Sequence, residues 1–268
     1  MSAPDVRAVG EPGAPEPSGV TPFWVEPTAA LRGSVVVLAG RGESAAVYER
    51  LANRLAFDGY RVAVIADASR GLPGARHSAS ALLAERPELP RVLLGSDTGA
   101  SVAAVLLAEG AVPADVAVLA GLPVDAPGAP GAPLDWDEEL ELRSACPVHR
   151  GALSRDGAVE HGALGRSDAL TERVDAGLLQ RIAVPVLTVH GAADALSPVG
   201  AATALLEVLP DAESYVVAGG RHDILNDVTH RSVAATIVLF LERLRNPDRS
   251  RVVVPAAEAL PLAAGLVA

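Results

Sequence analysis

The sequence predicts an α/β fold in which a mostly parallel central sheet is flanked by helices. Short apolar runs rich in valine recur along the chain, and most are unbroken, as in strands covered on both faces. Segments with a helical pattern stand between these runs. Glycine or proline follows near the end of each helical segment, which is a typical stop signal. Strands that alternate with helices in this way form parallel sheets.

Six segments are predicted to be strands and four to be helices. The predicted strands are residues 35–39, 62–66, 92–94, 116–120, 184–189 and 214–217. The predicted helices are residues 45–57, 78–86, 100–108 and 199–209. Catalytic side chains in such folds are expected on the loops at the carboxyl ends of the strands.

The length of 268 residues, half of them apolar, is sufficient for one large core. We expect a disordered N-terminal arm at residues 1–20, one α/β domain at residues 21–250 and an apolar C-terminal tail at residues 251–268. Residues 122–181 contain no strand-like run. We interpret them as a small cap insertion over the carboxyl ends of the strands, and a plain surface loop is the alternative.

Composition argues against several classes of function. The net charge is −11 and no dense arginine cluster occurs, so no nucleic-acid partner is predicted. Cys146 is the single cysteine, and zinc-binding spacings are absent, so neither an intramolecular disulfide nor a metal site is expected. No signal peptide or membrane span is recognised, and the expected location is the cytoplasm. The oligomeric state is left open.

The strongest local signal is the turn Gly95-Ser96-Asp97-Thr98-Gly99 between a predicted strand and a helix of small residues. In a Gly-x-Ser-x-Gly elbow, the glycines relieve crowding, so that the middle residue is strained and exposed at the strand tip. Here the middle residue is Asp97, whose carboxylate faces a helix N-terminus that favours its ionised form. The alternative is that Asp97 only caps the helix.

Two further residues follow strand ends in a meaningful order. Asp194 comes just after the strand at residues 184–189, and His222 follows the strand that ends near Val217. Nucleophile, acid and histidine is the chain order of an α/β-hydrolase triad. Taken singly, Asp194 is equally well explained as a turn residue and His222 as a surface histidine. Their shared order and placement favour a triad with Asp97.

The loop at residues 40–45 has two interpretations. Its glycines resemble the dinucleotide-binding pattern G-x-G-x-x-G/A, for which Asp67 would supply the trailing acid. Alternatively, the loop supplies an oxyanion-hole amide from Arg41. We favour the second interpretation, because the first leaves the elbow and the acid–histidine pair without a role. No cofactor is therefore predicted.

Together these motifs resemble the α/β-hydrolase superfamily, and most of all its lysophospholipase and monoglyceride-lipase-like branch. The resemblance covers about residues 34–245. It is carried by Ala39–Glu43 before Tyr48, by the elbow, by Gly191-x-x-Asp194 and by Gly220-x-His222. It implies the fold of that superfamily. In this branch the elbow residue is serine, and this chain departs from the pattern at Asp97.

Aspartate nucleophiles are typical of two other groups in the same superfamily, the haloalkane dehalogenases and the epoxide hydrolases. Those enzymes usually follow the aspartate with Trp or Arg, whereas Thr98 follows it here. Epoxide hydrolases also use cap tyrosines, and the predicted cap contains none. Trp136 is the only residue of the predicted cap suited to bind a halide. Neither group matches the sequence fully.

We therefore predict a cofactor-independent hydrolase with an Asp-His-Asp triad, acting on a small apolar or amphiphilic substrate of the ester, epoxide or halide class. Asp97 would attack the substrate, and His222, oriented by Asp194, would activate water. The amides of Arg41 and Thr98 would stabilise the oxyanion. The alternatives are a catalytically degenerate hydrolase-fold binding protein and, less favoured, a nicotinamide-dependent Rossmann enzyme.

Overall fold

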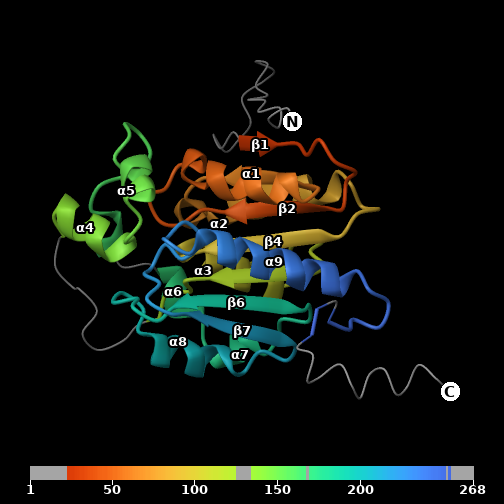
Figure 1. Ribbon diagram of the computed structural model, residues 1–268. Coiled ribbons are helices and arrows are strands. Elements are labelled where there is room, and N and C mark those ends of the chain that lie inside the picture. The colour runs from red at the N-terminus through yellow and green to blue at the C-terminus, as the bar shows by residue number, and fades with distance from the viewer. Residues whose placement is uncertain (1–22, 125–133, 167–168, 252, 255–268) are drawn as a thin grey trace.

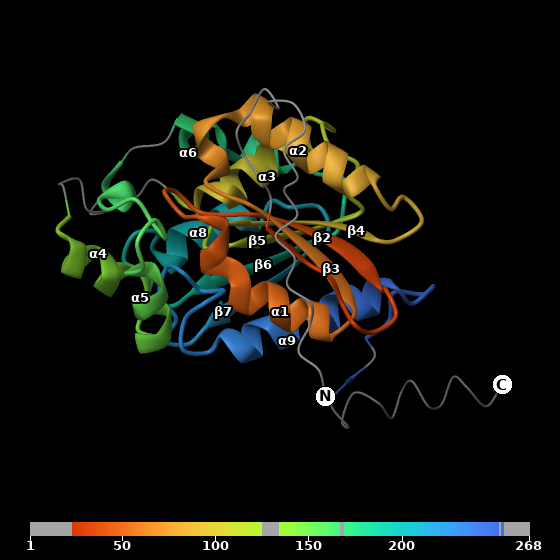
Figure 2. The same ribbon diagram turned by 90° about the horizontal axis from the view of Figure 1, so that it is seen from above.

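A seven-stranded sheet forms the centre of the molecule, and helices cover both of its faces (Figures 1 and 2). The computed structural model describes residues 23–124, 134–166, 169–251 and 253–254. The strand order is β1-β3-β2-β4-β5-β6-β7. β1 pairs antiparallel with β3, and the other neighbours pair in parallel. The mostly parallel sheet predicted from the sequence is confirmed.

The predicted strands are all present, and one edge strand was not foreseen. The strands are β1 (Phe23–Val25), β2 (Gly33–Leu38), β3 (Tyr60–Ile65), β4 (Arg91–Ser96), β5 (Val116–Ala120), β6 (Val186–Gly191) and β7 (Ala212–Val217). β1 has only three residues, two of them partly exposed, so it lacks the long apolar run by which the other strands were recognised.

The helices are α1 (Glu49–Phe57), α2 (Leu72–Ala84), α3 (Thr98–Ala108), α4 (Trp136–Arg143), α5 (Pro147–Leu153), α6 (Ala169–Arg173), α7 (Ala176–Leu179), α8 (Val199–Leu206) and α9 (His230–Leu244). α2 begins six residues before the predicted start at residue 78, since Pro73 stands in its first turn, where proline is tolerated. Because strands β2 to β7 are parallel, the loops that follow β2, β4, β6 and β7 all lie at the carboxyl edge of the sheet.

Two apolar cores lie on opposite faces of the sheet. α1 and α9 cover one face, and α2 and α3 cover the other (Figure 2). Alternate residues of β2 point to opposite cores, Val35 and Val37 to the first and Val36 and Leu38 to the second, as the two-residue period of a strand requires. Burial on both faces explains why the strands read as unbroken apolar runs.

Helices α4 to α7 lie between β5 and β6, in the region predicted as the cap. α4 and α5 project beyond the carboxyl ends of the strands (Figure 1). A capping box between Asp135 and Glu138 fixes the start of α4. An isolated bridge pairs Glu43 with Val159, which ties this region to the loop after β2. The division of the chain into a main domain and a cap stays a prediction.

Other predictions fall on the chain ends. The arm at residues 1–20 lies outside the described residues, as does most of the tail at residues 251–268. In the part of the chain that the structure describes, no helix is both long and apolar enough to cross a membrane. The cytoplasmic location stays a prediction.

Candidate active site

Asp97 occupies a strained turn between β4 and α3. Its backbone has φ 51° and ψ −128°, a left-handed φ that residues other than glycine rarely adopt. The turn also needs close backbone contact, because a Cβ atom on Gly99 would lie 2.1 Å from the carbonyl oxygen of Leu38. The Asp97 side chain makes no capping hydrogen bond to α3. Its carboxylate is therefore available for other partners.

In the predicted triad, His222 lies within hydrogen-bond distance of both Asp97 and Asp194. His222 Nδ1 is 2.8 Å from Asp194 Oδ2, and His222 Nε2 is 3.1 Å from Asp97 Oδ1. All three residues are buried. The histidine thus bridges the two carboxylates, in the arrangement that a nucleophile, a base and an orienting acid require.

The loops that carry Asp194 and His222 touch through their backbones. Asp194 follows β6 and His222 follows β7, and these strands pair in parallel. A Cβ atom on Gly191 would lie 2.3 Å from the carbonyl oxygen of Gly220, and the Ala193 amide donates to that same oxygen at 2.9 Å. The distance between acid and histidine is therefore set largely by the main chain.

Arg41 binds the Asp97 carboxylate with both its backbone and its side chain. The amide donates to Oδ2 at 2.8 Å. Nε donates to Oδ2 at 2.9 Å and to Oδ1 at 3.1 Å, and Nη2 donates to Oδ1 at 2.8 Å. The guanidinium also donates through Nη1 to the carbonyl oxygen of Arg166. The sequence predicted an oxyanion-hole role for this amide, which stays a prediction, and missed the side-chain ion pair.

Thr98, the second predicted oxyanion residue, is the first residue of α3 and is fully buried. Among the residues described, no hydrogen bond joins its amide to the Asp97 carboxylate, and its hydroxyl has no partner. Its role in stabilising an oxyanion stays a prediction.

Solved structures with a similar fold are found in several organisms. A soluble variant of monoglyceride lipase from Saccharomyces cerevisiae, in complex with a substrate analogue, has 15% identity and a TM-score of 0.71, covering 91% of this chain and 96% of its own. A monoacylglycerol lipase from Paleococcus ferrophilus has 21% identity and a TM-score of 0.67, covering 82% and 99%. A carboxyl esterase from Bacillus coagulans has 17% identity and a TM-score of 0.67, covering 83% and 93%.

The chain has the α/β-hydrolase fold. The sequence matches no protein-family model, and it has no significant match among curated protein sequences. At these low identities the structural likeness establishes the fold, and any reaction has to be argued from this chain's own side chains.

The charges around Asp97 balance. Burial opposes its ionisation, but Arg41 and His222 outweigh burial and hold the pKa of Asp97 well below its usual value. Burial alone would lower the pKa of His222, whereas Asp194 and Asp97 raise it to about 10. Burial likewise opposes ionisation of Asp194, and His222 lowers its pKa overall. At neutral pH two carboxylates thus face an imidazolium and a guanidinium.

A second group of buried charges, here called the cap cluster, consists of Glu43, Glu139, Arg143, His149 and Asp223. Arg143 is fully buried and pairs with Glu139 at 2.9 Å, with Glu43 at 3.0 Å and with Asp223 at 3.6 Å. His149 Nε2 lies 2.9 Å from Asp223 Oδ2. Sequence reasoning missed this cluster, in which three carboxylates share one guanidinium and one imidazole.

The cap cluster supports the loop that carries Arg41. Glu43 Oε2 accepts from the Gly40 amide at 3.0 Å and from the Tyr48 hydroxyl at 2.5 Å. Arg143 Nη2 donates to the carbonyl oxygen of Arg41 at 3.3 Å. The cap cluster therefore binds the Gly40 amide and the Arg41 carbonyl oxygen, which lie on either side of the Arg41 amide that donates to Asp97.

The same cluster also reaches the histidine loop. The amide of Asp223, the residue after His222, donates to the carbonyl oxygen of Arg143 at 2.8 Å. Burial and then Asp223 raise the pKa of Glu43 to about 7, although Arg143 opposes the shift. Helix α4 is thus tied to the loop that carries Arg41 and to the loop that carries His222.

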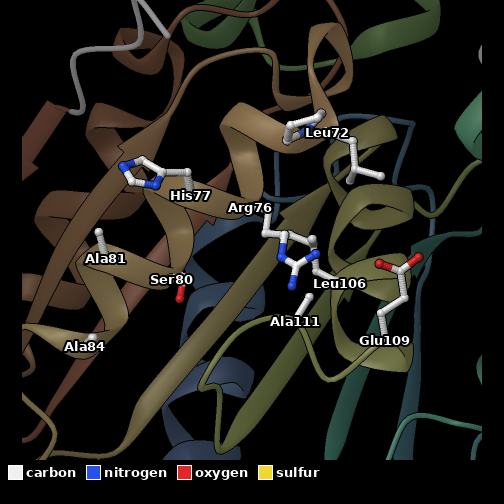
Figure 3. A pocket seen from close by; sticks show the side chains of 10 residues that line it. Leu72, Arg76, His77, Ser80, Ala81, Ala84, Leu106, Glu109 and Ala111 are labelled. Carbon is white, nitrogen blue, oxygen red and sulfur yellow. The ribbon is translucent and has the colours of Figure 1, made fainter. Parts of the chain in front are cut away.

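Two hollows lie outside the triad. One, of about 580 Å³, adjoins the Arg41 loop and is lined by Gly42, Glu43 and Arg70 among others. The other is a groove of about 660 Å³ along α2, shown in Figure 3, and none of its lining residues belongs to the loops that carry Arg41, Asp97, Asp194 and His222. Within the described residues, no group of His, Cys, Asp and Glu side chains is arranged to hold a metal ion.

Proposed function

We propose that this chain is a cofactor-independent hydrolase in which Asp97 is the nucleophile. The observation that carries the proposal is the Asp97 carboxylate at a strained elbow, 3.1 Å from a histidine that is itself bonded to Asp194. The substrate is a small apolar or amphiphilic molecule with a halide or a strained oxygen on an sp³ carbon. Attack on a carboxylic ester would form an anhydride, which is unfavourable, whereas attack on an sp³ carbon forms a stable alkyl ester.

The reaction has two steps. First, a carboxylate oxygen of Asp97 displaces the leaving group and forms an ester with the substrate carbon. Second, water attacks the Asp97 Cγ atom while His222 accepts a proton from that water. The amide of Arg41, which already donates to Oδ2, stabilises the oxyanion that forms at this carbon. The intermediate then collapses: the bond between Cγ and the substrate oxygen breaks, and that oxygen takes the second proton of the water. The alcohol leaves, and the carboxylate is restored beside the protonated His222.

His222 changes its acidity between the two steps. In the free enzyme its pKa is raised to about 10, mainly by Asp194 and also by Asp97, so it is protonated and binds the nucleophile. Formation of the ester removes the charge of Asp97. The pKa of His222 then falls, because one of its two carboxylates is gone. The histidine becomes a base only when there is an ester to hydrolyse.

The source of the product oxygen tests the proposal. We expect a single turnover of bromohexane or hexene oxide, with enzyme in excess in ¹⁸O-labelled water, to place ¹⁸O in Asp97 and unlabelled oxygen in the alcohol. In His222→Gln the second step stops, so the peptide that contains Asp97 should gain the mass of the alkyl group. Mass spectrometry measures both results.

The matched control is Asp97→Asn in the His222→Gln background, which should form no adduct. Label in the alcohol and none in Asp97 would mean that water attacks the substrate directly. In a separate variant, Asp97→Ser restores the serine of the lipase-like branch, and we expect weak activity on short p-nitrophenyl esters. If no substrate is turned over, nothing is trapped and the folded serine variant is inert, Asp97 is not a nucleophile.

The second candidate function is a degenerate hydrolase fold that binds a ligand without chemistry. Two observations favour it. Arg41 covers the Asp97 carboxylate with a bidentate ion pair, and a hollow of about 580 Å³ adjoins the loop of Arg41. The same isotope and trapping experiments separate the two candidates, since a binding protein gives neither label nor adduct.

A further inference from the structure

The side chain of Arg41 presents two N–H groups to the nucleophile. Nε and Nη2 form one edge of the guanidinium, and this edge faces both oxygens of Asp97 at 2.8–3.1 Å. Nη1, on the other side of the group, donates to the carbonyl oxygen of Arg166 at 3.0 Å. The guanidinium is largely buried, with 14% of the side chain exposed. Its edge is therefore aimed at the place where the first bond would form and break.

Formation of an ester changes what that edge binds. An ionised carboxylate is a strong acceptor for an arginine edge, and a neutral ester is much weaker. When Asp97 Oδ attacks, its negative charge disappears, and the same charge appears on the leaving group. The Nε–H and Nη2–H groups thus lose a charged acceptor while a new anion forms on the far side of the substrate carbon, and the long arginine side chain has to turn from the first to the second.

We propose that this edge of Arg41 binds the anion that leaves, and that the substrates of the site are alkyl halides. The inference rests on the proposed role of Asp97 as nucleophile. One electron pair of the Asp97 carboxylate forms the C–O bond, and the electron pair of the carbon–halogen bond departs with the halide. No proton is transferred in this step, so a permanently charged donor is sufficient.

An epoxide would make a different demand. Ring opening produces an alkoxide that needs a proton, and arginine does not release one in proteins. The tyrosine hydroxyls are engaged elsewhere: Tyr48 donates to Glu43, Tyr60 to Glu242 and Tyr215 to Glu213. Among the donors described around Asp97, only the protonated His222 could give that proton. The edge of Arg41 by itself therefore suits a leaving group that is stable as an anion.

Trp136, suggested by the sequence as a halide donor, is placed differently. Its ring stacks on His161, with ring centroids 3.9 Å apart. Among the described contacts none joins it to Asp97. Arg41 takes over the role that the sequence suggested for Trp136.

Bromide binding tests the inference without a substrate. Asp97→Asn keeps the shape of the side chain and removes its charge, as the ester does. We expect this variant to bind bromide at least about tenfold more tightly than the parent, since charge-assisted hydrogen bonds to Arg41 are then open to the anion. Line broadening in bromide NMR, in halide-free buffer, measures the affinity.

Two double variants test whether the bromide binds at the Arg41 side chain. Asp97→Asn with Arg41→Gln should lose the gain. Asp97→Asn with Arg166→Gln should keep it, because the Arg166 side chain pairs with Glu160 and the hydrogen bond from Arg41 goes to the Arg166 carbonyl oxygen, which the substitution retains. Bromide binding that does not depend on Arg41, or no bromide binding in a folded Asp97→Asn variant, would overturn the inference.

A second measurement uses a variant that keeps Asp97. In His222→Gln, we expect bromohexane to form the Asp97 adduct at least about tenfold faster than hexene oxide, with the adduct slowed by further Arg41→Gln substitution. Faster reaction of the epoxide would overturn the halide assignment and leave Asp97 standing as the nucleophile. Absence of any adduct would instead mean that Asp97 is not a nucleophile.

Discussion

The triad and the cap cluster lie at the same edge of the sheet, and both bury charges, but they balance them differently. Around Asp97, two carboxylates face His222 and Arg41, and the pKa shifts of Asp97, Asp194 and His222 favour the ionised form of each. In the cap cluster, three carboxylates face one guanidinium and one imidazole, and the pKa of Glu43 is raised to about 7.

This difference separates two uses of buried charge. In the proposed mechanism, the charges of the triad belong to groups that exchange protons or form bonds, so a change at one group alters the others. The cap cluster directs its donors and acceptors to main-chain atoms and to helix α4. We infer that the first group serves chemistry and the second holds the loops, and substitutions in the two groups should therefore have different consequences.

The largest expected effect comes from the cation of each group. Arg143→Met leaves three buried carboxylates without their shared guanidinium, and we expect a loss of about 3–5 kcal/mol in the free energy of unfolding. Arg41→Met leaves Asp97 with His222 as a partner, and we expect about 1–3 kcal/mol. Equilibrium unfolding in urea measures both. Equal losses would mean that the two groups are not distinct.

The second-largest expected effect is a loss of folding stability as pH rises through two ranges. A raised pKa means that the folded state holds its proton more tightly than the unfolded chain, so stability falls as pH rises through the shift. For Glu43 the window runs from 4.5 to about 7, and for His222 from 6.5 to about 10. Each pKa unit corresponds to about 1.4 kcal/mol.

Two single variants show which residue is responsible for each pH range. Glu43→Gln should remove the loss of stability in the lower window, and His222→Gln should remove it in the upper window. Urea unfolding at half-unit pH intervals measures both, with the parent as reference. If one substitution flattened both windows, the two groups would titrate as a single unit.

The smallest effect is expected at Tyr48. Its hydroxyl donates to Glu43 Oε2 at 2.5 Å and lowers the pKa of that carboxyl. Tyr48→Phe should therefore cost about 1–2 kcal/mol of stability and move the lower pH window upward. Unfolding at several pH values measures this, and Tyr215→Phe, at an exposed tyrosine bonded to Glu213, is the control. An unmoved window would mean that the Tyr48–Glu43 bond does not stabilise the carboxylate.

Local patterns in the sequence were sufficient for the sheet and for the three loops of the site. Unbroken valine runs predicted the buried strands. The Gly-x-Asp-x-Gly spacing predicted the tight turn, in which position 99 has room only for glycine. Order along the chain then brought Asp194 and His222 to the same edge. The valine runs and the turn spacing are each contained within a few neighbouring residues.

What the sequence did not reveal depends on contacts across the fold. The Arg41 side chain reaches Asp97 only once β2 and β4 are paired, and many rotamers of a long side chain fit the same loop. Glu43 and Arg143 are 100 positions apart, and no periodic pattern links them. Their burial as charged residues follows from tertiary contacts alone.

The backbone contact between Gly191 and Gly220 has a consequence for mutational tolerance. An added Cβ atom on Gly191 would overlap a carbonyl oxygen at 2.3 Å, and one on Gly99 would do so at 2.1 Å, so neither position accepts another residue without displacing a catalytic loop. Asp97, Thr98 and Arg41 already carry a Cβ atom, so exchange of their side chains adds no such overlap, although any residue at position 97 has to adopt the left-handed φ of 51°. Laboratory evolution of this scaffold toward other reactions should therefore randomise those three side chains and leave the glycines fixed.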